Sequence, residues 1–238
     1  MKALFRCFAM FLRQITKDSM LLAAMAAPFL AGTAFRFGVP ALDAVLCKAL
    51  DRPELLEPYH RLFDLFLIAM TPYIFCFASS MVILTEVDEN MAAYLAVTPV
   101  GKRGYILSRL LFPAMLSIPV TVVLVQFFFL TPWNAPLLLL ACLLSGALSV
   151  AATLLIVALS SNRVEGMALA KLSGIVLLGL PIPFFIFSDM QYLFSPLPSF
   201  WIAKLSVEHN GLLYVLPAVL TLFLWIRGLY GRFVRKLA

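Results

Sequence analysis

Few side chains in this sequence have the types and spacing that catalysis or metal binding would need. The two histidines, His60 and His209, lie far apart in polar segments, and the four cysteines form no CxxC pair. The Gly101-Lys102 dipeptide has no glycine five positions before Gly101, and Arg103 stands where a phosphate-binding loop carries Ser or Thr. We therefore expect no catalytic residue, no metal ion and no cofactor in this chain. We do not expect the chain to hydrolyse ATP alone.

The composition indicates a membrane protein. Hydrophobic residues make up 63% of the sequence, charged residues only 13%, and the mean hydropathy is +1.00. A soluble domain carries roughly 25% charged residues, so lipid must cover much of this apolar surface. The net charge of +6 then reports membrane topology, and we expect no nucleic-acid partner.

Long apolar segments predict an all-α integral membrane fold with six transmembrane helices in a domain spanning residues 19–238. A membrane-spanning helix needs about 20 apolar residues. Ionisable side chains are scarce inside the segments, with Asp64 and Glu86 at span ends, which argues against a carrier driven by protons or sodium. The expected spans cover residues 19–35, 64–85, 105–130, 137–159, 172–187 and 212–225.

Two further helical features flank these spans. Residues 1–18 predict an amphipathic helix with basic side chains on one side and aromatic ones on the other, as in helices that lie in the membrane interface. Packing of this helix on the protein is the alternative. Residues 193–205 are apolar but short and contain Pro196 and Pro198, so we expect a pair of external or re-entrant helices there. The basic residues of the first helix are Lys2, Arg6, Arg13 and Lys17.

The basic residues also predict the orientation of the chain. With the N-terminus inside, thirteen of the 18 Lys and Arg residues lie in inner segments, and both termini are expected in the cytoplasm. The protein would then be a multi-pass protein of the cell membrane. These inner residues are Lys2, Arg6, Arg13, Lys17, Lys102, Arg103, Arg109, Arg163, Lys171, Arg227, Arg232, Arg235 and Lys236.

The inner loop between the second and third spans, residues 86–104, is the candidate contact for a cytoplasmic partner. Its acidic residues are expected to begin a short helix, because negative charge is favoured at a helix N-terminus. Three apolar residues at i, i+3 and i+4 form one face of that helix, and a Thr-Pro pair ends it. A solvated connecting loop is the alternative. The candidate residues are Glu86, Asp88, Glu89, Met91, Tyr94, Leu95, Thr98 and Pro99.

From these acids to the stretch YLAVTPVGKRGYILSRL, the sequence resembles the E-x-E-x-G-T…L-L-V-T-P…Y-L-x-x-K/R pattern of ABC-2-type permeases, the type-2 ABC exporters. Tyr105 and Arg109 match the positions that lead into the third span, whereas Asn90-Met91 replaces the Gly-Thr of the pattern. The order of the parts is also similar over nearly the whole chain: an interfacial elbow helix, six spans, the inner loop, and paired short helices before the last span.

The resemblance implies a permease subunit driven by a separate cytoplasmic ABC ATPase, which would bind ATP and Mg²⁺. The inner loop would dock on that ATPase as a coupling helix, and the elbow helix would contact it from the side. A second copy of the chain, or a related permease subunit, would complete the transport path. Phe194, Phe200 and Trp201 would help to close its outer end.

Two other classes of function are compatible with the sequence. A membrane scaffold or assembly protein would share the spans without transporting anything. A membrane-embedded enzyme or secondary carrier is disfavoured by the scarcity of polar residues inside the spans. Co-purification of an ATPase with a phosphate-binding loop would distinguish the permease from both.

Overall fold

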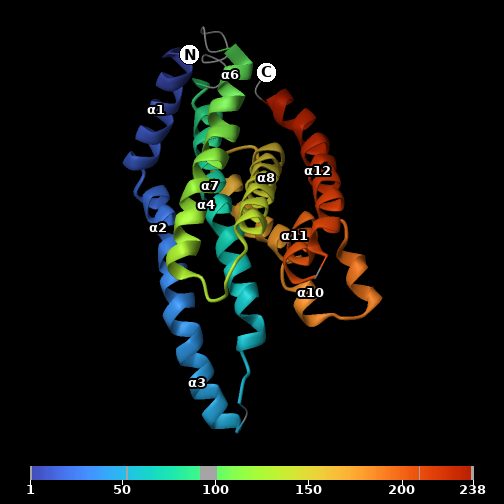
Figure 1. Cartoon of the computed structure of the whole chain (residues 1–238). Coiled ribbons are helices and arrows are strands. Elements are labelled where there is room, and N and C mark those ends of the chain that lie inside the picture. The colour runs from blue at the N-terminus through green and yellow to red at the C-terminus, as the bar shows by residue number, and fades with distance from the viewer. Residues whose placement is uncertain (1, 52, 92–100, 209, 237–238) are drawn as a thin grey trace.

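The computed structural model describes residues 2–51, 53–91, 101–208 and 210–236, and these residues form helices and turns with no strand among them (Figure 1). This confirms the all-α fold. The α-helices are α1 (Lys2–Lys17), α2 (Ser19–Thr33), α3 (Val39–Leu50), α4 (His60–Asp88), α6 (Gly101–Ile106), α7 (Phe112–Phe128), α8 (Ala135–Leu159), α9 (Arg163–Ser173), α10 (Ile182–Phe185), α11 (Pro198–Val207) and α12 (Val215–Lys236). Shorter 3₁₀ or π-helical turns are η1 (Ala34–Gly38), η2 (Glu57–Tyr59), η3 (Leu107–Leu111), η4 (Gly174–Leu177), η5 (Asp189–Phe194) and η6 (Gly211–Tyr214).

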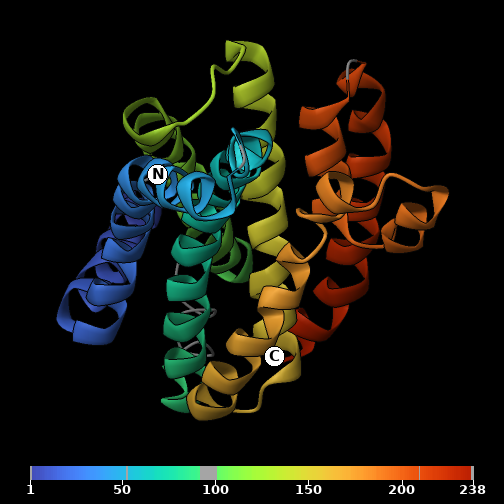
Figure 2. The same ribbon diagram turned by 90° about the horizontal axis from the view of Figure 1, so that it is seen from below.

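Within the described part of the chain, 5 continuous helical segments are long and apolar enough to cross a membrane. Two of them are mostly buried inside the protein, and the first and last are largely exposed, as expected for helices that face lipid or another subunit. Figure 2 shows α2 and α12 on opposite sides of the α4 and α8 pair. The segments are Ser19–Leu50, Glu57–Asp88, Gly104–Phe128, Ala135–Leu159 and Gly211–Lys236.

The pairing of α4 with α8 forms the centre of the bundle. A face of small residues on α8 allows the two backbones to approach closely. Ser149 Oγ donates a hydrogen bond to Cys76 Sγ at 3.2 Å, and Thr153 Oγ1 donates to the Cys76 carbonyl oxygen at 3.0 Å. The partner of this face is therefore a helix of the same chain. The face comprises Ala141, Ser145, Ser149 and Thr153, all buried.

The first span is longer than the sequence predicted. The helix does not end near Phe35 but continues through η1 into α3, for 32 residues in all. At 1.5 Å per residue it is about 48 Å long, roughly 18 Å more than the hydrocarbon layer. Arg36, the residue just after the expected end of this span, donates a hydrogen bond to the Phe129 carbonyl oxygen at 2.8 Å. The extra turns of α3 extend beyond the other helices in Figure 1.

The expected fifth span, residues 172–187, is not a continuous helix. It is divided into the end of α9, the turn η4, and the four-residue helix α10. Pro181 and Pro183 remove backbone donors in this segment. Gly179 packs so closely on α11 that an added Cβ would lie 2.5 Å from Phe200 N. The prolines and this close contact both lie where the helix is interrupted.

The remaining helices follow the sequence-based boundaries to within a few residues, except that α12 continues to Lys236. The expected pair of short helices before the last span is present as η5 and α11. The two ends of the described chain lie at the same end of the bundle (Figure 1). There, Lys236 Nζ at the end of α12 donates to the Val157 carbonyl oxygen near the end of α8, at 3.1 Å.

Candidate coupling site and transmembrane groove

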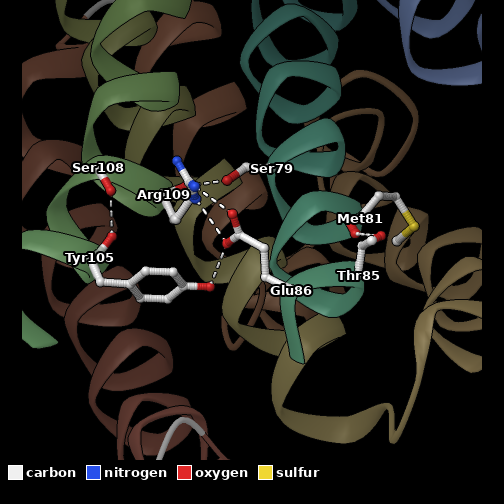
Figure 3. Close-up of polar contacts among 7 residues, drawn as sticks. All are labelled: Ser79, Met81, Thr85, Glu86, Tyr105, Ser108 and Arg109. Atoms are coloured by element: carbon white, nitrogen blue, oxygen red, sulfur yellow. Dashed lines mark hydrogen bonds and ion pairs between the residues drawn. The ribbon is translucent and has the colours of Figure 1, made fainter. Parts of the chain in front are cut away.

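A buried ion pair joins the two helices that flank the inner loop. Glu86, in the last turn of α4, accepts hydrogen bonds from Tyr105 Oη at 2.8 Å and from Arg109 Nε at 3.0 Å (Figure 3). Arg109 Nη2 donates a second bond to the other carboxylate oxygen of Glu86. Both charged side chains are 0% exposed. The pair is therefore bidentate and shielded from solvent, which is the geometry that a buried charge pair requires.

The same cluster also holds the first helix. The Arg109 guanidinium carbon lies 5.3 Å from the centre of the Phe11 ring of α1 and 5.7 Å from that of Tyr105. Ser79 Oγ donates to the Arg109 carbonyl oxygen, which adds a further bond between α4 and η3. The cluster thus joins α1 and α4 to the beginning of the third span.

A second polar network lies at the same end of the bundle. Asp18 caps α2 by accepting from Met20 N and Leu21 N at 3.0 and 3.2 Å, and it forms an ion pair with Arg163 at the start of α9. Arg163 N donates to an Asp88 carboxylate oxygen at 2.9 Å. Partial burial raises the pKa of Asp18, but the hydrogen bond and charge of Arg163 and the two backbone bonds together lower it below its ordinary value.

An open cavity of about 520 Å³ lies beside this network. Residues from α1, from the start of α2, from α4 and from α9 line it, among them Gln14, Asp18, Thr85 and Arg163. Glu89 also lines this cavity. The cavity therefore opens next to the base of the inner loop.

The candidate coupling residues are divided between the end of α4, the turn that follows it, and residues outside the described part of the chain. Glu86 and Asp88 belong to the last turns of α4, so the expectation that they begin a new helix is wrong: α4 continues to Asp88. Glu89 is exposed just beyond it, and Asn90, with φ of 57°, turns the chain before the half-buried Met91. Tyr94, Leu95, Thr98 and Pro99 lie outside the described residues.

The first helix is only partly an exposed interfacial helix. Phe11 and Ile15 are buried by the protein, and the Phe8 ring packs edge-on against Phe112 at 5.2 Å. Among the described side chains of this face, Phe11 and Ile15 therefore pack inside the protein, as the alternative for this helix expected, while Leu12 is exposed. Arg13 and Lys17 are exposed. The side chains of Lys2 and Arg6 lie outside the described part of the chain.

The candidate outer gate residues lie in or beside an aromatic cluster. The Phe200 and Trp201 rings of α11 are 5.0 Å apart in edge-to-face geometry, and the Trp201 ring stacks on Tyr214 at 6.1 Å. Phe194 is half-buried in η5. Sequence reasoning did not find that the buried Lys204 completes this cluster, donating to Tyr192 Oη at 3.0 Å. Its i, i+4 spacing to Glu208 was the available signal, because that spacing permits an ion pair, here 3.3 Å long.

An apolar groove runs between α2, α4 and α9. Its volume is about 670 Å³, within the range of small-molecule sites. Small and flexible side chains of α2 form one wall, and Tyr73 and Phe77, one turn apart on α4, form another. Lys171 of α9 also lines the groove. We call this feature the α2–α4–α9 groove.

The long apolar helices define a multi-pass membrane protein. The model of a family described as "Fluoroquinolones export permease protein Rv2686c-like" matches residues 11–230, and the chain belongs to this family of export permeases. Two curated relatives, the "Fluoroquinolones export permease protein" of Mycobacterium tuberculosis strains CDC 1551 and H37Rv, are each 26% identical to it over 198 residues. The aligned region covers 81% of this chain and 77% of each relative. No solved structure matched the chain.

Proposed function

We propose that this chain is the membrane-spanning permease subunit of an ATP-binding-cassette exporter of the ABC-2 type. A separate cytoplasmic ATPase would dock on the inner loop and supply the energy. The observation that carries the proposal is the buried contact of Glu86 with Arg109 and Tyr105, which connects both helices at the base of that loop. A push on the loop would then move α4 and the third span together.

Three features of the sequence and structure support this assignment. The chain carries no phosphate-binding loop, so energy must come from elsewhere. The family match supports export. The helices α2 and α12 present largely exposed apolar surfaces, which lipid and a second permease subunit, identical or related, would cover. We propose that both chain ends and the inner loop face the cytoplasm, where basic residues are enriched.

The cargo that we propose is an amphipathic aromatic compound of the fluoroquinolone kind. The name of the two relatives supports this class. The size of the α2–α4–α9 groove and its apolar lining with two aromatic rings are compatible with it.

A substitution in the loop tests the coupling role. Tyr94→Arg places a charge on the apolar face that would enter the ATPase, whereas Tyr94→Phe keeps the ring and serves as the control. We expect the arginine variant to lose the co-purifying ATPase, or to keep it while losing fluoroquinolone export from cells. The phenylalanine variant should behave as the wild type does. Normal export by the arginine variant would refute the coupling role. If the tagged wild-type chain retains no ATPase, the scaffold function is favoured.

A further inference from the structure

The depth of Lys171 in the bundle follows from its neighbours on α4. The Tyr73 hydroxyl donates to the Ala170 carbonyl oxygen at 3.0 Å and shares a 2.6 Å hydrogen bond with Ser173 Oγ. Tyr73 lies 9 residues from Asp64 and 13 from Glu86 along α4, or about 13 and 20 Å along the helix axis. Since Asp64 and Glu86 lie near the two ends of this span, Tyr73 and the end of α9 are close to the middle of the membrane.

Lys171 is thus a cation well inside the membrane layer. Its side chain is exposed and lines the α2–α4–α9 groove. Within the described part of the chain, no acidic residue lines this groove, and the ammonium group makes no ion pair or hydrogen bond. The sequence placed Lys171 just before a continuous fifth span, on the inner side. Because the expected span is divided after Ser173, Lys171 instead lies near the end of α9, beside the middle of α4.

A lysine at this depth is costly if it faces hydrocarbon. Such residues are retained where they face water or a ligand of opposite charge, and the groove provides that space. Tyr73 and Phe77 line the same groove and add aromatic side chains to its wall. The groove therefore combines a flat apolar wall with one positive charge, which is the complement of a planar aromatic molecule that carries an acid group.

We propose that Lys171 binds the carboxylate of an aromatic cargo inside the α2–α4–α9 groove and so determines which compounds the permease accepts. This proposal rests on the proposed function, and it adds the acid group as the feature recognised. Fluoroquinolones carry a carboxylate on a planar ring system, so they fit the site in both respects. A compound of the same shape with an esterified acid would lose the contact with Lys171 and keep the apolar contacts.

The test uses the full-length chain with its ATPase in phosphatidylcholine nanodiscs, and ciprofloxacin and its ethyl ester as probes. Binding is followed by drug fluorescence, and export by accumulation in cells. The variants are Lys171→Met, Lys171→Arg, and Lys48→Met in α3 as the control, because Lys48 is exposed far from the groove. We expect Lys171→Met to weaken binding of the acid by about 10- to 100-fold, the effect of losing one charge-assisted bond. It should leave binding of the ester unchanged. Lys171→Arg should largely restore binding of the acid.

Two results would overturn the inference while leaving the proposed function intact. The first is wild-type export of ciprofloxacin together with equal binding of the acid by Lys171→Met and the wild type. The second would come from nanodiscs that contain phosphatidylglycerol. If Lys171→Met loses the bound anionic lipid but binds the drug as the wild type does, the groove holds a lipid phosphate instead of the cargo. Failure of the wild-type complex to export either probe would instead refute the proposed function.

Discussion

Removal of either partner of the Glu86–Arg109 pair should destabilise the protein at least as much as removal of both. Glu86→Gln leaves the guanidinium charge buried without its carboxylate, and Arg109→Met leaves the carboxylate without its cation. Breaking a fully buried ion pair in this way costs about 3–5 kcal/mol. In the double variant no charge is left, and the side-chain amide introduced by Glu86→Gln can still accept from Tyr105 Oη, which bonds Glu86 at 2.8 Å in the wild type. We expect the double variant to cost no more than either single one.

Thermal unfolding of the four purified proteins in one detergent measures this difference. For a chain of this size, 1 kcal/mol corresponds to about 2–4 °C, so each single variant should lower Tm by roughly 6–20 °C. The coupling energy from the double-mutant cycle should be several kcal/mol. Additive losses in the double variant, or single losses below about 1 kcal/mol, would refute the view that this pair connects the two helices in the membrane.

Two more predictions concern the inner end and the divided fifth span. Asp18→Asn should lower Tm at pH 7. Because the folded protein lowers the pKa of Asp18, the ionised carboxylate stabilises the fold at pH values above the ordinary pKa of Asp, and this stabilisation is lost as the pH falls below about 4. The Tm values of variant and wild type should therefore converge in acid. A Tm difference that persists in acid would contradict this. Gly179→Ala should cost about 1–3 kcal/mol, because its Cβ would lie 2.5 Å from Phe200 N, whereas Gly228→Ala, which meets nothing within 4 Å, should be neutral or stabilising. Equal Tm values for the two alanine variants would exclude the close contact.

Composition and apolar length were sufficient to predict the helical membrane fold, because both are summed over many residues. The small face of α8 was also readable, since its four-residue spacing is a local property. The length of the first helix was not readable: the charged Arg36 follows the apolar run at the expected end of the span, and its hydrogen bond to the distant Phe129 carbonyl oxygen is not visible in the sequence. The division of the fifth span lies beside the close contact of Gly179 with α11, which sequence spacing does not show.

The candidate site was predictable in part. Tyr105 and Arg109 were named from the family pattern, but their contact with Glu86 joins residues 19 and 23 positions apart across the inner loop. The signal was present in the sequence: Arg109 lies within the expected third span, where a charge needs a partner. Lys171 was assigned to the inner side because it lies between the expected spans 137–159 and 172–187. The docking roles of Tyr94, Leu95, Thr98 and Pro99 stay predictions.

The most direct test of the account is drug transport by the purified chain in proteoliposomes, with and without its ATPase subunit. We predict ATP-dependent movement of ciprofloxacin only when both proteins are present, and none by the permease chain alone in the presence of ATP or an ion gradient. Transport by the chain alone would contradict the account, because the energy source would then lie within the permease itself.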